Sequence, residues 1–190
     1  MAQITYADKS TMNSNSSIPA TNKCQASDMN EIKSVVNSNY TELRNAIDDK
    51  NIITIALTSN FSIPTANTLV QVTGWGVLNS IGNKLTLSNN KIVIGSGVSK
   101  VLVSYKADVR SSSSAANTNV YLTHNNEVIS QEVVSFSATN QTHTAAYTPR
   151  LLNVNQNDTI YLSMYGPKNN NLEWGWGNNY RTIITVEVVE

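Results

Sequence analysis

Aromatic side chains within a glycine- and asparagine-rich stretch are the residues of this sequence best suited to bind a ligand. Trp174, Trp176 and Tyr180 lie within residues 172–180, and Trp75 also stands between two glycines. Aromatic rings stack on the apolar face of a sugar, and they also anchor many protein interfaces. We therefore predict a glycan or receptor contact at these four rings. Packing in the core or in a subunit interface is the alternative.

Catalytic and metal-binding patterns are absent from the sequence. His124 and His143 lie far apart in polar settings, and no spacing of His and Cys typical of a zinc site occurs. Paired carboxylates would suit a glycosidase, but no motif surrounds the acidic residues of the second half of the chain. Nucleophile and phosphate-binding motifs are also missing. We therefore expect no enzymatic activity, no metal and no cofactor.

The composition limits the kinds of partner. Lys+Arg and Asp+Glu are equal in number at 13, and only 14% of residues are charged, so nucleic acid is not an expected partner. No apolar run approaches the roughly 20 residues of a membrane span, and no secretory signal is visible. Cys24 is the one cysteine, which excludes a disulfide within the chain.

Residues 28–50 have the pattern of a helix with an apolar stripe. Asp28 and Glu31 have the spacing of an N-cap and its reciprocal partner. The positions that follow the 3-4 spacing of a coiled coil, here called the helix seam, are Met29, Ile32, Val36, Asn39, Leu43 and Ala46. So short a coiled coil is marginal alone, and Asn39 would fix its register at a cost in stability. The alternative is a single amphipathic helix packed on the rest of the chain.

The segments on either side of this helix differ in character. Residues 1–27 are polar and without periodicity, which predicts an extended segment that does not fold alone. Residues 51–190 contain alternating runs such as 101–109, 160–165 and 183–189, separated by asparagine- and glycine-rich turns. We count about ten such runs, which predicts a mainly β protein with a ten-stranded antiparallel jelly-roll sandwich.

Five segments of the β region match one pattern of strands and turns: residues 58–64, 82–94, 97–105, 151–162 and 181–188. Together they resemble the trimeric jelly rolls of the tumour necrosis factor and complement globular-head superfamily, in the version found in phage and bacterial surface proteins. Asn157 and Asp158 stand where that family has Gly-Asp, and asparagine tolerates the same left-handed turn. The resemblance implies a homotrimer, hence a trimeric coiled coil, and carries over no catalytic residues.

The N-terminal segment has a resemblance of its own. Ile4, Tyr6, Asp8 and Lys9, with residues 22–33, resemble the leading segment of tailed-phage fibre and minor structural proteins. This implies a virion fibre, assembled in the host cytoplasm, whose N-terminus attaches to the head, neck or tail of the particle. The jelly roll would then point outward toward host-surface glycans. The alternatives are a bacterial surface adhesin or lectin and, less favoured for so short a chain, a polysaccharide depolymerase.

Overall fold

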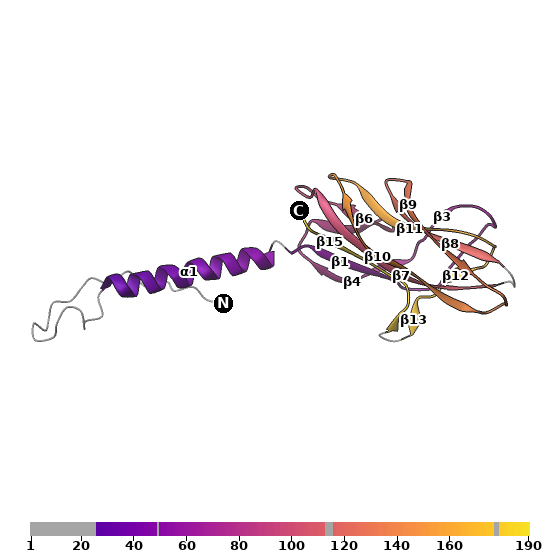
Figure 1. Ribbon diagram of the computed structural model, residues 1–190, viewed down its shortest axis with the longest axis horizontal. Helices are drawn as coiled ribbons and strands as arrows, with labels where there is room; N and C mark the ends of the chain where they lie inside the picture. Colours follow the sequence, from indigo (N-terminus) through magenta and orange to yellow (C-terminus); the bar gives the residue numbers. More distant parts are fainter. Residues whose placement is uncertain (1–25, 49, 113–115, 177–178) are drawn as a thin grey trace, which may run out of the picture. The chain divides into compact units, whose positions relative to one another are not determined.

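The computed structural model of this protein describes residues 26–48, 50–112, 116–176 and 179–190 (Figure 1). The chain divides into two compact units, Met1–Asp49 and Lys50–Glu190, and each is considered by itself. The residues predicted to attach to a virion, Ile4, Tyr6, Asp8 and Lys9, lie outside the described residues.

The first unit contains helix α1 (Ala26–Asp48), which is the helix predicted from the apolar spacing. Within the single chain, the seam side chains Met29, Ile32, Val36 and Leu43 are between 39% and 55% exposed. Asn39 is exposed as well, and the side chain of Ala46 lies outside the described part. Val35, which the heptad pattern leaves out, is another exposed apolar residue, at 52%. The helix therefore carries an apolar stripe that the single chain leaves in contact with solvent.

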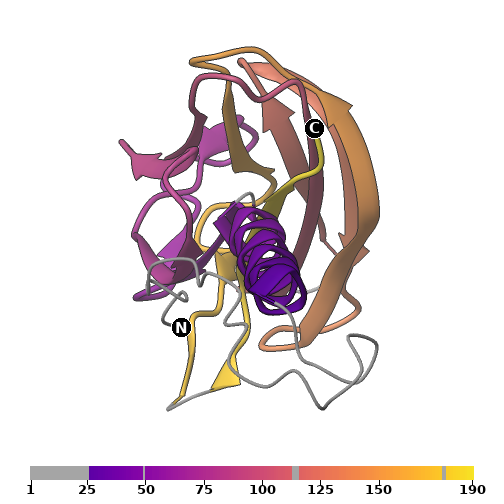
Figure 2. The same cartoon turned by 90° about the vertical axis from the view of Figure 1, so that its left-hand side faces the viewer.

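The second unit is an antiparallel sandwich of two sheets. The seven-stranded sheet contains β1 (Ile52–Leu57), β2 (Phe61–Ser62), β4 (Trp75–Ile81), β7 (Lys100–Arg110), β10 (Thr142–Asn153), β12 (Asn171–Leu172) and β15 (Ile183–Val188). The six-stranded sheet contains β3 (Val70–Gln71), β5 (Leu85–Ser88), β6 (Lys91–Ile94), β8 (Asn117–His124), β9 (Glu127–Ser135) and β11 (Thr159–Tyr165). A separate hairpin of β13 (Gly175–Trp176) and β14 (Asn179–Tyr180) projects from the two sheets in both views (Figures 1 and 2).

The two sheets thus hold thirteen described strands, and the predicted number of ten is wrong. Strands β2 and β12 are absent from the alternating runs because two residues are too few to show alternation, although β2 lies within residues 58–64, one of the segments that carry the resemblance. Strand β4 was missed because it is an edge strand, and its last five residues are all exposed. Alternation between polar and apolar residues marks a strand only where one face of it is buried.

The core lies between the two sheets. The strands that were predicted are those with one face buried in this core, because burial of one face produces the alternation of apolar and polar residues. Every second residue of β7, from Val101 to Val109, is buried, and the intervening residues face away from the core. Leu162 and Met164 of β11 are fully buried in the same cluster. The alternating runs at 160–165 and 183–189 correspond to β11 and β15.

Asparagine makes the turns of this unit. The eight described residues other than glycine with positive φ are all asparagines. Asn89 and Asn90 join β5 to β6, and Asn125 and Asn126 join β8 to β9, with φ between 49° and 70°. Positive φ at both central residues is the requirement of a type I′ hairpin turn. Asn157 has φ of 71°, so the left-handed turn predicted there is confirmed.

Candidate functional site

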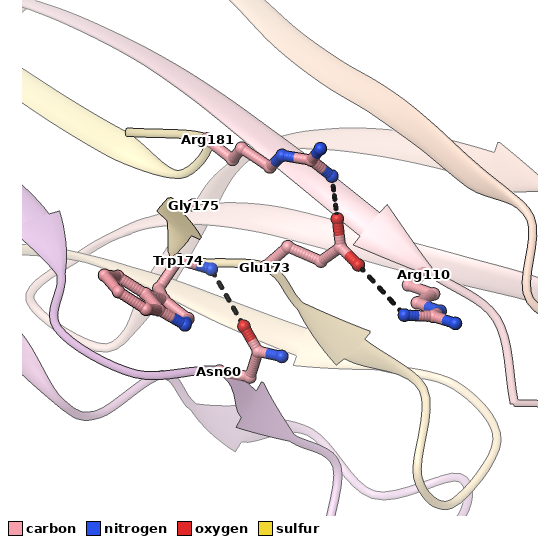
Figure 3. Close-up of a pocket in the computed structure, with 6 residues that line it drawn as sticks. All are labelled: Asn60, Arg110, Glu173, Trp174, Gly175 and Arg181. Atoms are coloured by element: carbon pink, nitrogen blue, oxygen red, sulfur yellow. Dashed lines mark hydrogen bonds and ion pairs between the residues drawn. The ribbon is translucent and has the colours of Figure 1, made fainter. Parts of the chain in front are cut away.

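A pocket of about 280 Å³ lies beside Trp174 in the jelly-roll unit. Its lining residues are Asn60, Arg110, Glu173, Trp174, Gly175 and Arg181 (Figure 3). They come from the last residue of β7, the loop between β1 and β2, and the segment that runs from β12 through the β13–β14 hairpin toward β15. Segments far apart in the sequence therefore meet at this point.

Backbone hydrogen bonds hold Glu173 in place at the base of the pocket. Its amide N donates to the carbonyl oxygen of Asp108 on β7 at 2.9 Å. Its carbonyl oxygen accepts a hydrogen bond from Oγ1 of Thr182 at 2.8 Å, and Thr182 is fully buried. The main chain at Glu173 is therefore fixed from both sides, which sets the direction of its side chain.

The Glu173 carboxylate lies between two guanidinium groups. Figure 3 shows Arg181 and Arg110 on either side of it: Oε2 pairs with Nη1 of Arg181, and Oε1 lies 3.5 Å from Nη1 of Arg110. The Glu173 side chain is 11% exposed, whereas those of Arg110 and Arg181 are 44% and 43% exposed. A nearly buried carboxylate requires such pairing. Two cations against one anion leave an excess of one positive charge among these three groups.

Trp174 lines both this charged pocket and a second, more apolar groove. Its amide N donates to Oδ1 of Asn60 at 3.0 Å, which ties the residue to the β1–β2 loop. The Trp174 side chain is partly buried and packs against the core. The same residue also lines a groove of about 270 Å³ together with Ala56, Leu57, Thr58, Gly76, Val77 and Leu78.

Of the four predicted aromatic contacts, the structure places Trp174 in the pocket. Trp176 and Tyr180 belong to the β13–β14 hairpin, where the backbone of Tyr180 pairs with Gly175 of the pocket lining. Their side chains lie outside the described part. The prediction for Trp75 is wrong, because Trp75 is a core residue with 8% exposure whose Nε1 donates to the carbonyl oxygen of Val72 at 3.1 Å. A buried ring cannot stack on a sugar.

Sequence reasoning missed Arg110, Arg181 and Asn60 as pocket residues. Arg181 directly follows the aromatic stretch, so its position was a usable signal. Arg110 and Asn60 lie at least 60 residues away, and only the pairing of β12 with β7 and with β2 brings them near Trp174. A single sequence carries no local signal for that pairing.

The two histidines take part in local contacts. Nε2 of His124 lies 2.8 Å from Oδ2 of Asp158, in the turn before β11. The ring of His143 packs edge-on against Phe136, with centroids 5.3 Å apart. Among the residues that the structure describes, no group of three or more His, Cys, Asp or Glu is arranged to hold a metal ion. Likewise, α1, the helix of the described part, is not long and apolar enough to cross a membrane.

Comparison with known proteins gives a fold and no family. No family model matches the chain, and no curated protein matches its sequence. Among solved structures, murine APRIL at pH 5.0 aligns with a TM-score of 0.54 at 10% identity, over 74% of this chain and all of that one. Murine APRIL at pH 8.5 gives the same score and coverage at 12% identity. The Eiger TNF of S. frugiperda gives 0.53 at 9% identity, over 74% of this chain and 92% of that one. The chain therefore contains a jelly roll of the tumour necrosis factor type.

Proposed function

We propose that this chain is a homotrimeric structural and binding protein without enzymatic activity, in which α1 joins three copies and the jelly roll presents a ligand site. The observation that carries the proposal is the exposed helix seam. Apolar side chains such as Ile32 and Leu43 are 55% and 49% exposed. Burying their surface would stabilise the assembly by roughly 25 cal/mol for each Å² of apolar surface removed from water. Further copies of the same seam, in register, would cover them as in a coiled coil.

A second apolar surface, on the jelly roll, supports the same association. On the face of the seven-stranded sheet turned away from the core, strand pairing aligns Ile81, Ile52, Glu187, Leu102 and Leu151 in one row across β4, β1, β15, β7 and β10. Ile81 and Leu151, at its two ends, are 41% and 51% exposed. The apolar members of this row would leave water if copies of the jelly roll packed against one another through this face.

The mass of the protein in solution tests this proposal. Light scattering on the full chain should give three times 20.7 kDa at micromolar concentration. Replacing Ile32 and Val36 together by asparagine should lower that mass, because the seam then buries amides in place of apolar groups. The matched control replaces Ser34 and Ser38, two exposed polar positions of α1, by asparagine and should leave the mass unchanged. A wild-type monomer would contradict the proposal.

The virion role rests on the resemblance of the N-terminal segment to phage fibre proteins. In this proposal, residues 4–9 attach the trimer to a phage particle, and the jelly roll points outward toward host-surface glycans. Deleting residues 1–25 should leave the trimeric mass intact and abolish incorporation into particles, as measured on purified particles with an antibody against the jelly roll. Normal incorporation of the shortened chain would refute the attachment role.

A further inference from the structure

We propose that the Trp174 pocket binds a sugar that carries a carboxylate, such as a uronic acid at the end of an acidic polysaccharide. This inference rests on the proposed binding function and adds the chemical class of the ligand. It is carried by three features of the pocket: the excess positive charge, the pairing of both guanidinium groups with one carboxylate, and the aromatic residue in the lining.

The charge of the pocket favours an anion. Arg110 and Arg181 share the single carboxylate of Glu173. The neighbouring carboxylate on β7, that of Asp108, accepts a hydrogen bond from Oγ1 of Thr144 at 2.7 Å. Thr144 belongs to β10, which pairs with the edge of β7 opposite to β12. Asp108 keeps its negative charge, but it is not part of the pocket lining, and the ion pairs of both arginines are with Glu173. The excess of one positive charge is therefore that of the three charged residues that line the pocket.

The guanidinium groups have donors to offer. Each guanidinium carries five N–H groups in a planar fork that matches a carboxylate. Among the described residues, Arg181 uses one of them on Glu173, and Arg110 pairs with Glu173 and donates to Oδ1 of Asn140 at 3.3 Å. Because Glu173 is fixed by its backbone, it holds both arginines in position before a ligand arrives. Such preorganisation lowers the entropy lost on binding.

Trp174 and Asn60 supply what a sugar ring needs beyond its charge. Trp174 places an aromatic side chain in the pocket lining, and the Asn60 amide has an N–H₂ donor whose orientation is set by the bond from Trp174 N to its Oδ1. A free inorganic anion would gain from the arginines and nothing from the ring. The volume of about 280 Å³ is just below the ~300–1,000 Å³ typical of ligand pockets. The pocket therefore fits one sugar unit and not an extended chain.

A titration of the full-length protein tests this assignment. The probes are methyl glucuronoside, methyl glucoside, which has the same ring without the carboxylate, and inorganic sulfate, with binding followed by calorimetry. The glucuronoside should bind at least about tenfold more tightly than the glucoside, since charge-assisted hydrogen bonds are lost with the carboxylate. Equal binding of the two glycosides, or no glucuronoside binding, would overturn the assignment. Sulfate that binds as tightly as the glucuronoside would also overturn it, since that marks a simple anion site.

Variants separate the roles of the pocket residues. Arg181→Gln should weaken glucuronoside binding at least about tenfold. Arg150→Gln, the same change at an exposed position outside the pocket lining, should leave it unchanged. Trp174→Ala should weaken glucuronoside binding and leave any weak sulfate binding as it was. Each variant is first checked for an unaltered urea unfolding midpoint, and Arg181→Lys replaces Arg181→Gln if that midpoint falls.

The outcome for the pocket is independent of the outcome for the assembly. Light scattering on the same samples reports the trimer. A trimeric protein that does not bind the glucuronoside would refute the ligand assignment and would agree with the proposed assembly. A monomer that binds the glucuronoside would refute the assembly and leave the pocket assignment standing.

Discussion

Two leucine residues, one in each unit of this chain, have opposite environments. Leu162 in the jelly roll is fully buried, whereas Leu43 in α1 is 49% exposed. The jelly roll surrounds its apolar side chains with two sheets of the same chain, while α1 leaves its apolar stripe in solvent. Most of the stability of a helix in a protein comes from packing of its apolar face, and α1 has 23 residues. The jelly roll thus has its own source of stability, whereas the source proposed for α1 is association with further copies of the chain.

This difference has a thermodynamic consequence. Unfolding of a domain with its own core depends on that core, whereas a helix that is stable only in a complex melts at a temperature that rises with protein concentration. Changes in the two units should therefore affect different observables.

The same substitution in the two units gives the largest contrast. Leu162→Ala should lower the free energy of unfolding of the jelly roll by about 2–5 kcal/mol, because it leaves a cavity in the core. Leu43→Ala should change that free energy by no more than about 0.5 kcal/mol and should weaken association instead. Urea unfolding followed by tryptophan fluorescence measures the first effect, and light scattering at increasing dilution measures the second. Equal effects of Leu162→Ala and Leu43→Ala on the unfolding free energy of the jelly roll would contradict the difference between the two units.

A substitution in the helix seam should act in the stabilising direction. Asn39→Val removes an amide that the coiled coil would bury, whose desolvation costs about 1–3 kcal/mol. We expect the helical circular dichroism signal to be lost at a higher temperature, with jelly-roll unfolding unchanged. Ser38→Val is the control, since it places the same side chain on α1 outside the seam. A similar rise in both variants would mean that helix content, and not the seam, controls the transition.

The turn before β11 makes part of the jelly-roll stability dependent on pH. Burial alone would raise the pKa of Asp158, but hydrogen bonds from Asn125, from the Asn155 backbone and from His124 favour its charged form and hold the pKa below the usual 3.8. A pKa lower in the folded state than in the unfolded state stabilises the protein above pH 3.8, and this contribution is lost as the pH falls through the folded-state pKa.

Asp158→Asn should therefore lower the unfolding free energy of the jelly roll by about 1–3 kcal/mol at neutral pH. It should also flatten the loss of stability in acid, so that wild type and variant converge once the pH falls below the folded-state pKa of Asp158. Urea unfolding across that pH range is the measurement. Glu127→Gln, at an exposed position of the neighbouring strand β9, controls for the removal of one negative charge. A constant difference between wild type and Asp158→Asn at every pH would contradict this account.

The asparagine turns should give the smallest effects. Asn89 has φ of 49°, a conformation that β-branched residues avoid and glycine accepts. Asn89→Val should lower the unfolding free energy by about 1–2 kcal/mol, and Asn89→Gly should change it by a few tenths of a kcal/mol. Urea unfolding of both variants tests this prediction. An unchanged unfolding free energy in Asn89→Val would show that the positive φ at this position does not affect stability.

Local sequence patterns predicted the elements that have one buried face. Residues 101–109 alternate because β7 has one face in the core. Strand β4 has an exposed edge and no such alternation, so nothing in its sequence marked it. Trp75 and Trp174 both neighbour glycines, yet one lies in the core and the other lines a pocket. That difference depends on which strands pair, and residue types nearby in the sequence do not encode it.

The candidate site was predictable only in its local part. The aromatic stretch identified Trp174, and Glu173 and Arg181 lie within nine residues of sequence around it, although neither was predicted as a site residue. Arg110 supplies half of the positive charge of the pocket but enters it through the pairing of Leu172 with Val109. Contacts between residues so far apart in the sequence depend on the order in which the strands pair in the whole sandwich.

Disulfide cross-linking through α1 tests most directly whether the helix seam joins copies of this chain. In a chain with Cys24→Ser, Val36→Cys places the only thiol in the seam, and Ser34→Cys places it two residues away on a different side of the helix. Under mild oxidation, Val36→Cys should form covalent pairs of chains on a non-reducing gel, and Ser34→Cys should remain largely single chains. Equal cross-linking of the two variants, or single chains only for Val36→Cys, would contradict association through the seam.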